Sequence, residues 1–249
     1  MTTDWHTHTN SCWWHPQEAR WVCDAGPAGP DRPLVDVRDM IVVHTALLRE
    51  FRLLPRAIAR VGTGDVRRAA VVDRHLGFLC DLLHHHHEGE DTLLWPKLRD
   101  RLPASAMAHL DEVETQHGGL VAVLQAVAAA RTRWTGDASA VHRDALVASL
   151  EDLHGQLKEH LDTEERAVLP LAASVLTDAE WHAVGAAAVA AMPKSALLLA
   201  FGMFAYEGDP AVLRDMLAAA PAVPRLLLPR IAPRAYARRA AQVHGTRRP

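Results

Sequence analysis

The stretch from residue 86 to residue 96, HHEGEDTLLWP, and the stretch from residue 160 to residue 170, HLDTEERAVLP, follow one pattern. Each begins with a histidine, has a glutamate four residues later and an acidic residue directly after it, and ends on a proline six residues beyond the glutamate. In an α-helix, residues i and i+4 lie on one face, about 6 Å apart along the axis. An imidazole and a carboxylate placed in this way can bind one metal ion. The repeat predicts two helices that each present such a pair, His86 with Glu90 and His160 with Glu164.

A further histidine precedes each copy at nearly the same distance. His44 lies 42 residues before His86, and His117 lies 43 residues before His160. Two residues of an antiparallel helical hairpin lie at the same height when the turn is midway between them. The midpoints between successive histidines fall at positions 65, 101–102 and 138–139. Helix-breaking residues stand at or beside each midpoint, namely Gly62 to Asp65, Pro103 and Gly136. The four histidines are therefore predicted to meet in one layer of a helical bundle.

Apolar residues recur at helical spacing between these breaks. The composition agrees, since Ala, Leu, Arg and Glu are abundant whereas β-branched and aromatic residues are scarce. We predict an all-α fold with an antiparallel up-down four-helix bundle over residues 36–176. The first helix runs from residue 36 to the break at Gly62, and the others span about 66–102, 105–133 and 140–176.

Two segments flank the predicted bundle. Residues 1–35 form a leader rich in Trp and His, and the Pro- and Gly-rich run 26–30 predicts an irregular linker there. Residues 177–249 are predicted to form a helical extension, opened by the capping-box pattern of residues 177–180. Prolines are expected to cut this extension into short pieces. They are Pro193, Pro210, Pro221, Pro224, Pro229 and Pro233.

The composition excludes several classes of protein. A formal net charge of −3 shows no excess that would favour nucleic acid as a partner. Three cysteines are too few, and uneven in number, for a disulfide scaffold. The chain opens without an apolar signal segment, and its longest apolar stretch, residues 181–206, is interrupted by Pro193 and Lys194. No transmembrane segment is therefore predicted, and a cytoplasmic location is the expectation.

The predicted site is a two-metal centre. Two glutamates in a bundle core would each be costly without a partner, but between two cations they become charge-compensated ligands. Nitrogen and carboxylate donors suit Fe, Mn or Zn, and helical bundles commonly hold two-metal carboxylate sites. Six protein ligands over two metals leave coordination positions for a small exogenous ligand. The predicted ligands are His44, His86, Glu90, His117, His160 and Glu164.

These residues resemble those of the hemerythrin-like (HHE cation-binding) family over roughly residues 36–176. Within that family, the pattern of four His and two Glu is most similar to the repair-of-iron-centres proteins and other bacterial hemerythrin-like proteins. The resemblance implies two non-haem Fe ions, with the four His as terminal ligands and Glu90 and Glu164 as bridges beside an oxo or hydroxo group. Oxygen-carrying hemerythrins use a fifth His on the third helix. Here Val113 and Val121 stand four residues either side of His117, so the fifth His is predicted to be absent, which favours a more open, reactive metal pair.

Two His-Glu pairs are possible within the histidine run 84–87. His84 with Glu88 has the same spacing as His86 with Glu90. Only Glu90 is followed by a proline six residues later, as Glu164 is in the other copy, so His86 is chosen as the ligand. The remaining members of the run, His84, His85 and His87, are predicted to be solvated or to pack behind the ligands.

Other chemistry-bearing residues receive less specific interpretations. Glu114 is a candidate seventh ligand or proton relay, although a surface position is favoured. Cys12, Cys23 and the histidines of the leader match no zinc spacing well, and packing of the leader tryptophans on the bundle is favoured. The remaining histidines are interpreted as structural or exposed, namely His75, His109, His142, His154 and His182.

The preferred function is a non-haem di-iron protein that binds or reduces a small oxidant, O2, H2O2 or NO, in stress or iron homeostasis. The alternatives are a non-catalytic sensor or carrier, and an oxygenase that acts on an organic substrate. Residues 221–249 carry seven Arg and no acidic residue. They predict a patch that binds an anionic partner or a membrane surface. The favoured interpretation is instead a basic face that pairs with acidic side chains elsewhere on the bundle.

Overall fold

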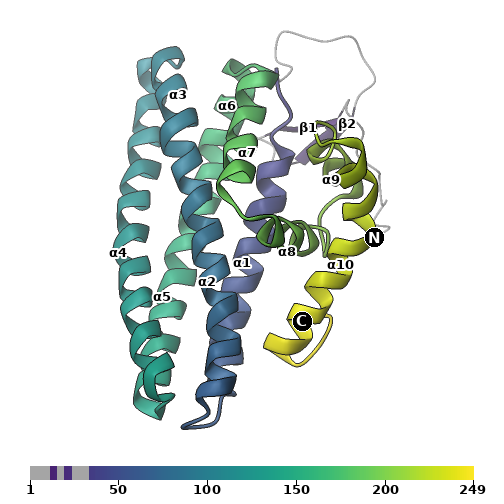
Figure 1. Cartoon of the computed structure of the whole chain (residues 1–249). Helices are drawn as coiled ribbons and strands as arrows, with labels where there is room; N and C mark the ends of the chain where they lie inside the picture. The colour runs from purple at the N-terminus through teal and green to yellow at the C-terminus, as the bar shows by residue number, and fades with distance from the viewer. Residues whose placement is uncertain (1–11, 16–19, 24–33) are drawn as a thin grey trace, which may run out of the picture.

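The computed structural model describes residues 12–15, 20–23 and 34–249. Four long helical rods lie side by side in an antiparallel bundle (Figure 1). The first is α1 (Arg38–Ala59); the second is α2 (Val66–Gly89), continued by a π-helical turn, Glu90–Leu94, and α3 (Trp95–Arg101). The third rod is a short 3-10 turn, Ala104–Ala106, followed by α4 (Met107–Asp137). The fourth is α5 (Ala140–Thr163), continued by a π-helical turn, Glu164–Val168, and α6 (Leu169–Val175). The predicted all-α bundle is confirmed.

The turns between the rods lie close to the predicted breaks. Asp65 caps α2 by accepting a hydrogen bond from the backbone N–H of Arg68 at 2.9 Å, and Ser139 caps α5 in the same way. The third rod was predicted to end near residue 133, but α4 continues to Asp137. Trp134 explains the difference. Burial of its side chain stabilises one more helical turn, and this gain offsets the modest free-energy cost of Gly136 in a helix.

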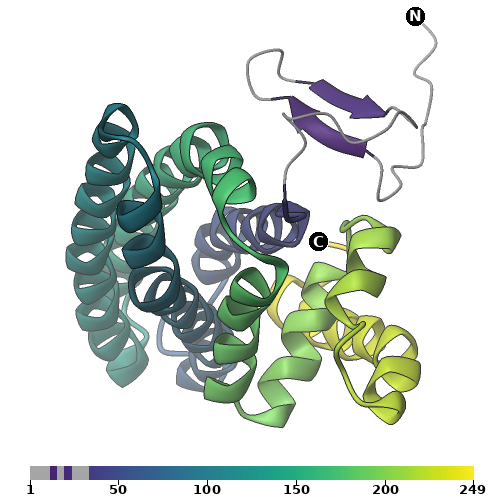
Figure 2. The same cartoon turned by 90° about the horizontal axis from the view of Figure 1, so that it is seen from above.

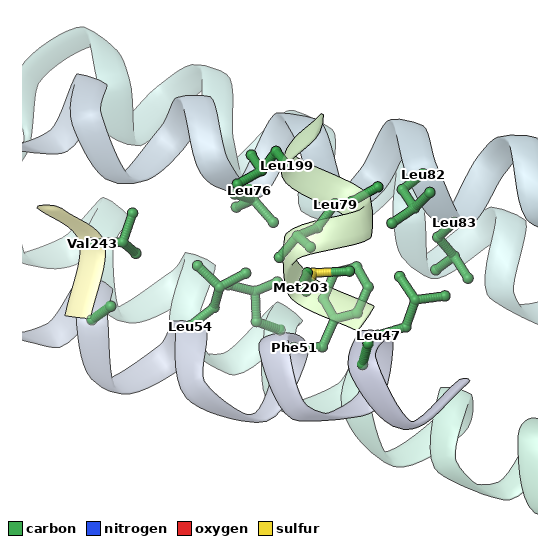
Figure 3. Packing of buried hydrophobic residues seen from close by; sticks show 14 of the residues in the cluster. Leu47, Phe51, Leu54, Leu76, Leu79, Leu82, Leu83, Leu199, Met203 and Val243 are labelled. Carbon is green, nitrogen blue, oxygen red and sulfur yellow. The ribbon is translucent and has the colours of Figure 1, made fainter. Parts of the chain in front are cut away.

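The extension packs against one side of the bundle (Figure 2). It consists of α7 (Asp178–Ala191), α8 (Lys194–Phe204), α9 (Pro210–Met216) and α10 (Ala222–His244). One apolar cluster joins it to the bundle: Leu47 and Phe51 of α1 and Leu79 of α2 surround Met203 of α8 (Figure 3). Burial of such side chains is worth about 1.5–3 kcal/mol each.

The expectation that prolines cut the extension is wrong for its last part. Prolines do stand at the starts of α8, α9 and α10, but α10 continues through Pro229 and Pro233. Packing on α8 explains this continuity. Gly202 of α8 lies so close to α10 that an added Cβ would be 2.2 Å from the carbonyl oxygen of Ala232. Tertiary contact at this crossing stabilises a helix that has lost backbone hydrogen bonds at its prolines.

A buried carboxylate also joins the extension to the bundle. Glu50 of α1 is fully buried. It accepts hydrogen bonds from the Tyr236 hydroxyl of α10 and from Nη2 of Arg49 at 3.2 Å. Nε2 of His75 lies 2.8 Å from it and Nε2 of His244 lies 3.4 Å from it. Of the two interpretations of His75, structural or exposed, its burial excludes the exposed one.

The leader contains a two-stranded antiparallel pair, β1 (Cys12–His15) and β2 (Arg20–Cys23), in which Cys12 is opposite Cys23. The sequence did not indicate these strands. The predicted linker at residues 26–30 and the predicted packing of the leader tryptophans lie outside what the structure describes. Within the described residues, no helix has the length and hydropathy needed to cross a bilayer.

Candidate metal centre

All six predicted ligands are buried in the middle of the bundle, and the structure brings them together in two adjoining groups. The helices α1, α2, α4 and α5 contribute one predicted histidine each, and the two π-helical turns contribute the glutamates. In each group the ligand atoms lie within 4.8 Å of one another. The predicted layer of four histidines is therefore present.

Each glutamate opens its π-helical turn, Glu90–Leu94 or Glu164–Val168. The residue after each turn donates its backbone N–H to the carbonyl of that glutamate, five residues back. Pro96 and Pro170 follow directly. In a regular helix, a proline ring clashes with the carbonyl four residues earlier, and a wider turn removes this contact. The repeated proline thus accounts for a local geometry that both copies share.

The first group contains two histidines and both glutamates. Nε2 of His44 lies 3.1 Å from Nε2 of His86 and 3.7 Å from Oε2 of Glu164. Nε2 of His86 lies 3.2 Å from Oε1 of Glu90. Four donor atoms from three helical rods thus converge on a space of the size that one cation needs.

The second group contains three histidines and Glu90, and one of these histidines was not predicted. Nε2 of His117 lies 3.4 Å from Oε2 of Glu90. The ring of His87 lies 4.2 Å from that of His117 and 5.2 Å from that of His160, between ring centroids. Oε2 of Glu164, 3.8 Å from Nε2 of His160, connects this group to the first.

Of the two positions predicted for His87, solvated or packed behind the ligands, the solvated one is wrong. Its side chain is 7% exposed, and its Nε2 has no hydrogen-bond partner among the described residues. His84 is exposed, as predicted, and His85 is partly exposed. The sequence did contain a signal for His87: it precedes Glu90 by three residues, a spacing that also shares a helix face.

The structure therefore assembles five histidines rather than four around the two glutamates. The fifth histidine, His87, lies on α2, whereas the two positions four residues either side of His117 are valines. Val113 is buried in an apolar cluster with Leu110 and Leu94, whereas Val121 is 53% exposed. Val121 instead lines an open surface cleft of about 520 Å³ that reaches His117.

Glu114 lies at the rim of the same cleft. It is partly exposed and forms an ion pair of 2.8 Å with Arg99. This position agrees with the favoured surface interpretation of Glu114.

The acidic residue that follows each glutamate binds a histidine of the opposite hairpin. Oδ1 of Asp91 lies 2.9 Å from Nδ1 of His117, and Oε1 of Glu165 lies 2.9 Å from Nδ1 of His44. A carboxylate there holds Nδ1–H as the donor and leaves Nε2 free for a metal. The sequence pattern contained both acids, but only the fold shows which histidine each one meets.

We expect Asp91→Ala and Glu165→Ala each to weaken metal binding about 10- to 100-fold, because the imidazole loses the group that sets its orientation and basicity. Competition with a chromophoric chelator measures the change. Asp162→Ala is the control, since the described residues give Asp162 an ion pair with the exposed Arg166 and none with a histidine of the site. Wild-type affinity in both variants would contradict this role for Asp91 and Glu165.

The charges of the site are poorly compensated by protein groups alone. Burial, and then the proximity of Glu90, raise the pKa of Glu164 to about 8. Burial raises the pKa of Glu90 and lowers the pKa values of His86 and His87 well below the usual range for histidine. None of the four glutamate oxygens accepts a hydrogen bond, within the geometry required for one, from any described residue. Cations between the imidazoles and the carboxylates would satisfy these atoms, so the residues fit a pair of metal ions.

Comparison with known proteins gives one match. A family model for the hemerythrin HHE cation-binding domain matches residues 35–172, which is more than half of the chain. No curated protein and no solved structure matches the chain. The matched range contains all seven buried His and Glu residues of the two groups.

Proposed function

Because this chain belongs to the hemerythrin HHE cation-binding family, we propose that it is a non-haem di-iron protein that binds or reduces a small oxidant, O2, H2O2 or NO. The observation that carries the proposal is the convergence of seven buried His and Glu residues in two adjoining groups. Mn and Zn suit the same nitrogen and carboxylate donors, and iron is the metal that would give the site redox activity.

The two metal positions are proposed to differ in their protein ligands. His44 and His86 would hold one ion, whereas His87, His117 and His160 would hold the other. Glu90 and Glu164 would serve both. The position with two histidines has fewer protein donors, so we propose that it accepts the exogenous ligand.

Access to the site is proposed to run through the cleft beside His117. Trp95, Gly118 and Val121 form part of its lining, together with the Arg99–Glu114 ion pair. A small molecule that enters this cleft would meet His117 of the second position first and would pass from there to the first position.

A second candidate function is reversible binding of the oxidant, as a carrier or sensor. The fifth histidine favours it, because an additional imidazole leaves one metal less open to reaction than the four-histidine set predicted from the sequence. Roles in oxidative stress or iron homeostasis, and a cytoplasmic location, remain predictions for either candidate.

Metal analysis tests the proposal. After iron supplementation, the purified protein is expected to contain about two Fe per chain, as in other two-metal carboxylate bundles. A reproducible content of one or none contradicts the di-iron proposal. Stopped-flow mixing of the reduced protein with O2, H2O2 and NO then separates the candidates: repeated turnover supports reduction, whereas a stoichiometric, reversible spectral change supports a carrier or sensor.

A further inference from the structure

The helix α10 has two faces of different character. Its inner face packs on α8 and the bundle through Ala232, Tyr236, Ala240 and Val243. On its first half the outer face presents four large apolar side chains, which are 67, 59, 44 and 44% exposed. They are Val223, Leu226, Leu227 and Ile231. The helix appears in yellow at the outer edge of the extension (Figure 1).

The same outer face also carries positive charge, from Arg230 onward. Arg230, Arg234 and Arg238 are exposed and are spaced by four residues, which aligns them along one side of the helix. Two of them fold along that side, since Arg234 donates to the carbonyl of Arg230 and Arg230 to the carbonyl of Leu226. By their spacing in the helix, the apolar residues lie within the same stripe.

No carboxylate in the described part of the chain forms an ion pair with the arginines of residues 225–248. The favoured interpretation of the sequence, a basic face answering acidic surface on the bundle, predicts such pairs. The last acidic residue of the chain is Asp215. The outer face of α10 thus combines unpaired positive charge with unburied apolar surface.

We propose that this face docks the protein on a membrane surface that contains anionic lipid headgroups. The arginines would meet the phosphates, while the apolar side chains would enter the headgroup boundary with the helix parallel to the membrane. The charge argues against a second copy of the chain, because a twofold contact through this face would bring arginines against arginines. The aliphatic side chains argue against nucleic acid, whose binding surfaces use polar and aromatic groups between the basic ones.

Vesicle sedimentation with the full, metal-loaded chain tests the proposal. Vesicles of 70% phosphatidylcholine and 30% phosphatidylglycerol are compared with pure phosphatidylcholine at about 0.1 M and 1 M salt, where the Debye length falls from about 10 to about 3 Å. We expect binding to the anionic vesicles at low salt, and at least tenfold weaker binding to neutral vesicles or at high salt.

Two multiple variants separate the components of the face. Arg230→Gln/Arg234→Gln/Arg238→Gln is expected to lower the affinity for anionic vesicles at least tenfold, since each basic residue near such a surface contributes roughly fivefold. The control exchanges arginines elsewhere on the surface, Arg56→Gln/Arg67→Gln/Arg133→Gln, and is expected to bind as the wild type does.

The apolar variant is Val223→Ser/Leu226→Ser/Leu227→Ser/Ile231→Ser. It is expected to lose binding while keeping metal content and melting temperature, with Val141→Ser/Val189→Ser, two exposed valines on other helices, as the control. Three outcomes would overturn the proposal: equal binding to neutral vesicles, equal loss in the controls, or no binding to anionic vesicles. Light scattering that finds a dimer abolished by the apolar variant, or retention of a DNA fragment by this face, would overturn it as well.

Discussion

The variant His87→Ala is expected to weaken the binding of one of the two metal ions and to change the spectrum of the iron-loaded protein. His87 is one of three histidines around the second metal position, and its removal leaves that position with His117, His160 and the two shared glutamates. Its imidazole is buried and neutral and has no other partner for Nε2 among the described residues, so the substitution removes a ligand rather than a hydrogen bond. Metal analysis and the ultraviolet-visible spectrum of the iron-loaded protein measure the effect.

His84→Ala is the matched control, because it removes an imidazole of the same run whose side chain is 69% exposed. It is expected to keep both metals. If His87→Ala keeps two metals and an unchanged spectrum, the four-histidine ligand set stands and His87 only packs beside it. Equal losses in the two variants would show that the run stabilises the helix rather than binding metal.

Replacement of Glu50 by alanine is expected to lower the free energy of unfolding by about 3–5 kcal/mol, the usual cost of removing one partner from a buried charge pair. Arg49 and the Tyr236 hydroxyl would lose an acceptor inside the protein. For a chain of this size the melting temperature should fall by roughly 10 °C. Glu207→Gln is the control: Glu207 pairs with the same arginine but is 40% exposed, so we expect an effect below about 1 kcal/mol.

The stabilisation by Glu50 should depend on pH. Burial alone would raise the pKa of its carboxyl group, but hydrogen bonds from His244, His75 and Tyr236 outweigh burial and hold the pKa well below the usual value of 4.5. A carboxyl group with a lowered pKa contributes stability that is complete above its unfolded-state pKa and is lost as the pH falls towards its folded-state pKa. The difference in stability between wild type and Glu50→Gln should therefore be constant near neutral pH and shrink below about pH 4.5. Urea unfolding at pH 7, 5 and 3.5 measures it, and a difference that grows with acid would contradict this account.

Much of the bundle could be predicted because its information is local and repeated. The two His-Glu pairs, their prolines and the spacing of His44 and His117 all indicate the same arrangement of helices. His87 was missed because four consecutive histidines satisfy several spacings at once, and a proline offset selects one frame without excluding a second ligand from the same turn. The fold resolves this ambiguity, because two successive residues of α2, His86 and His87, are both buried in the interior between the two hairpins.

The extension was predicted less well for a different reason. Its proline spacing indicates short helices, but α10 is held together by its contact with α8 at Gly202, which local sequence does not reveal. Glu50 shows the same limitation. Nothing in the neighbouring sequence of α1 distinguishes it from a surface glutamate, and its partners Tyr236 and His244 are almost two hundred residues away along the chain.

The way the two halves of the bundle share their ligands has a consequence for the order of assembly. The first ligand group takes Glu164 from the second hairpin, and the second group takes His87 and Glu90 from the first. Neither hairpin alone contains a complete set, so both must dock before either ion is held by all its ligands. In the proposed site, full coordination of either ion would therefore be coupled to the docking of the two hairpins. The rate at which bound metal exchanges with free isotope would then report how often the two hairpins move apart.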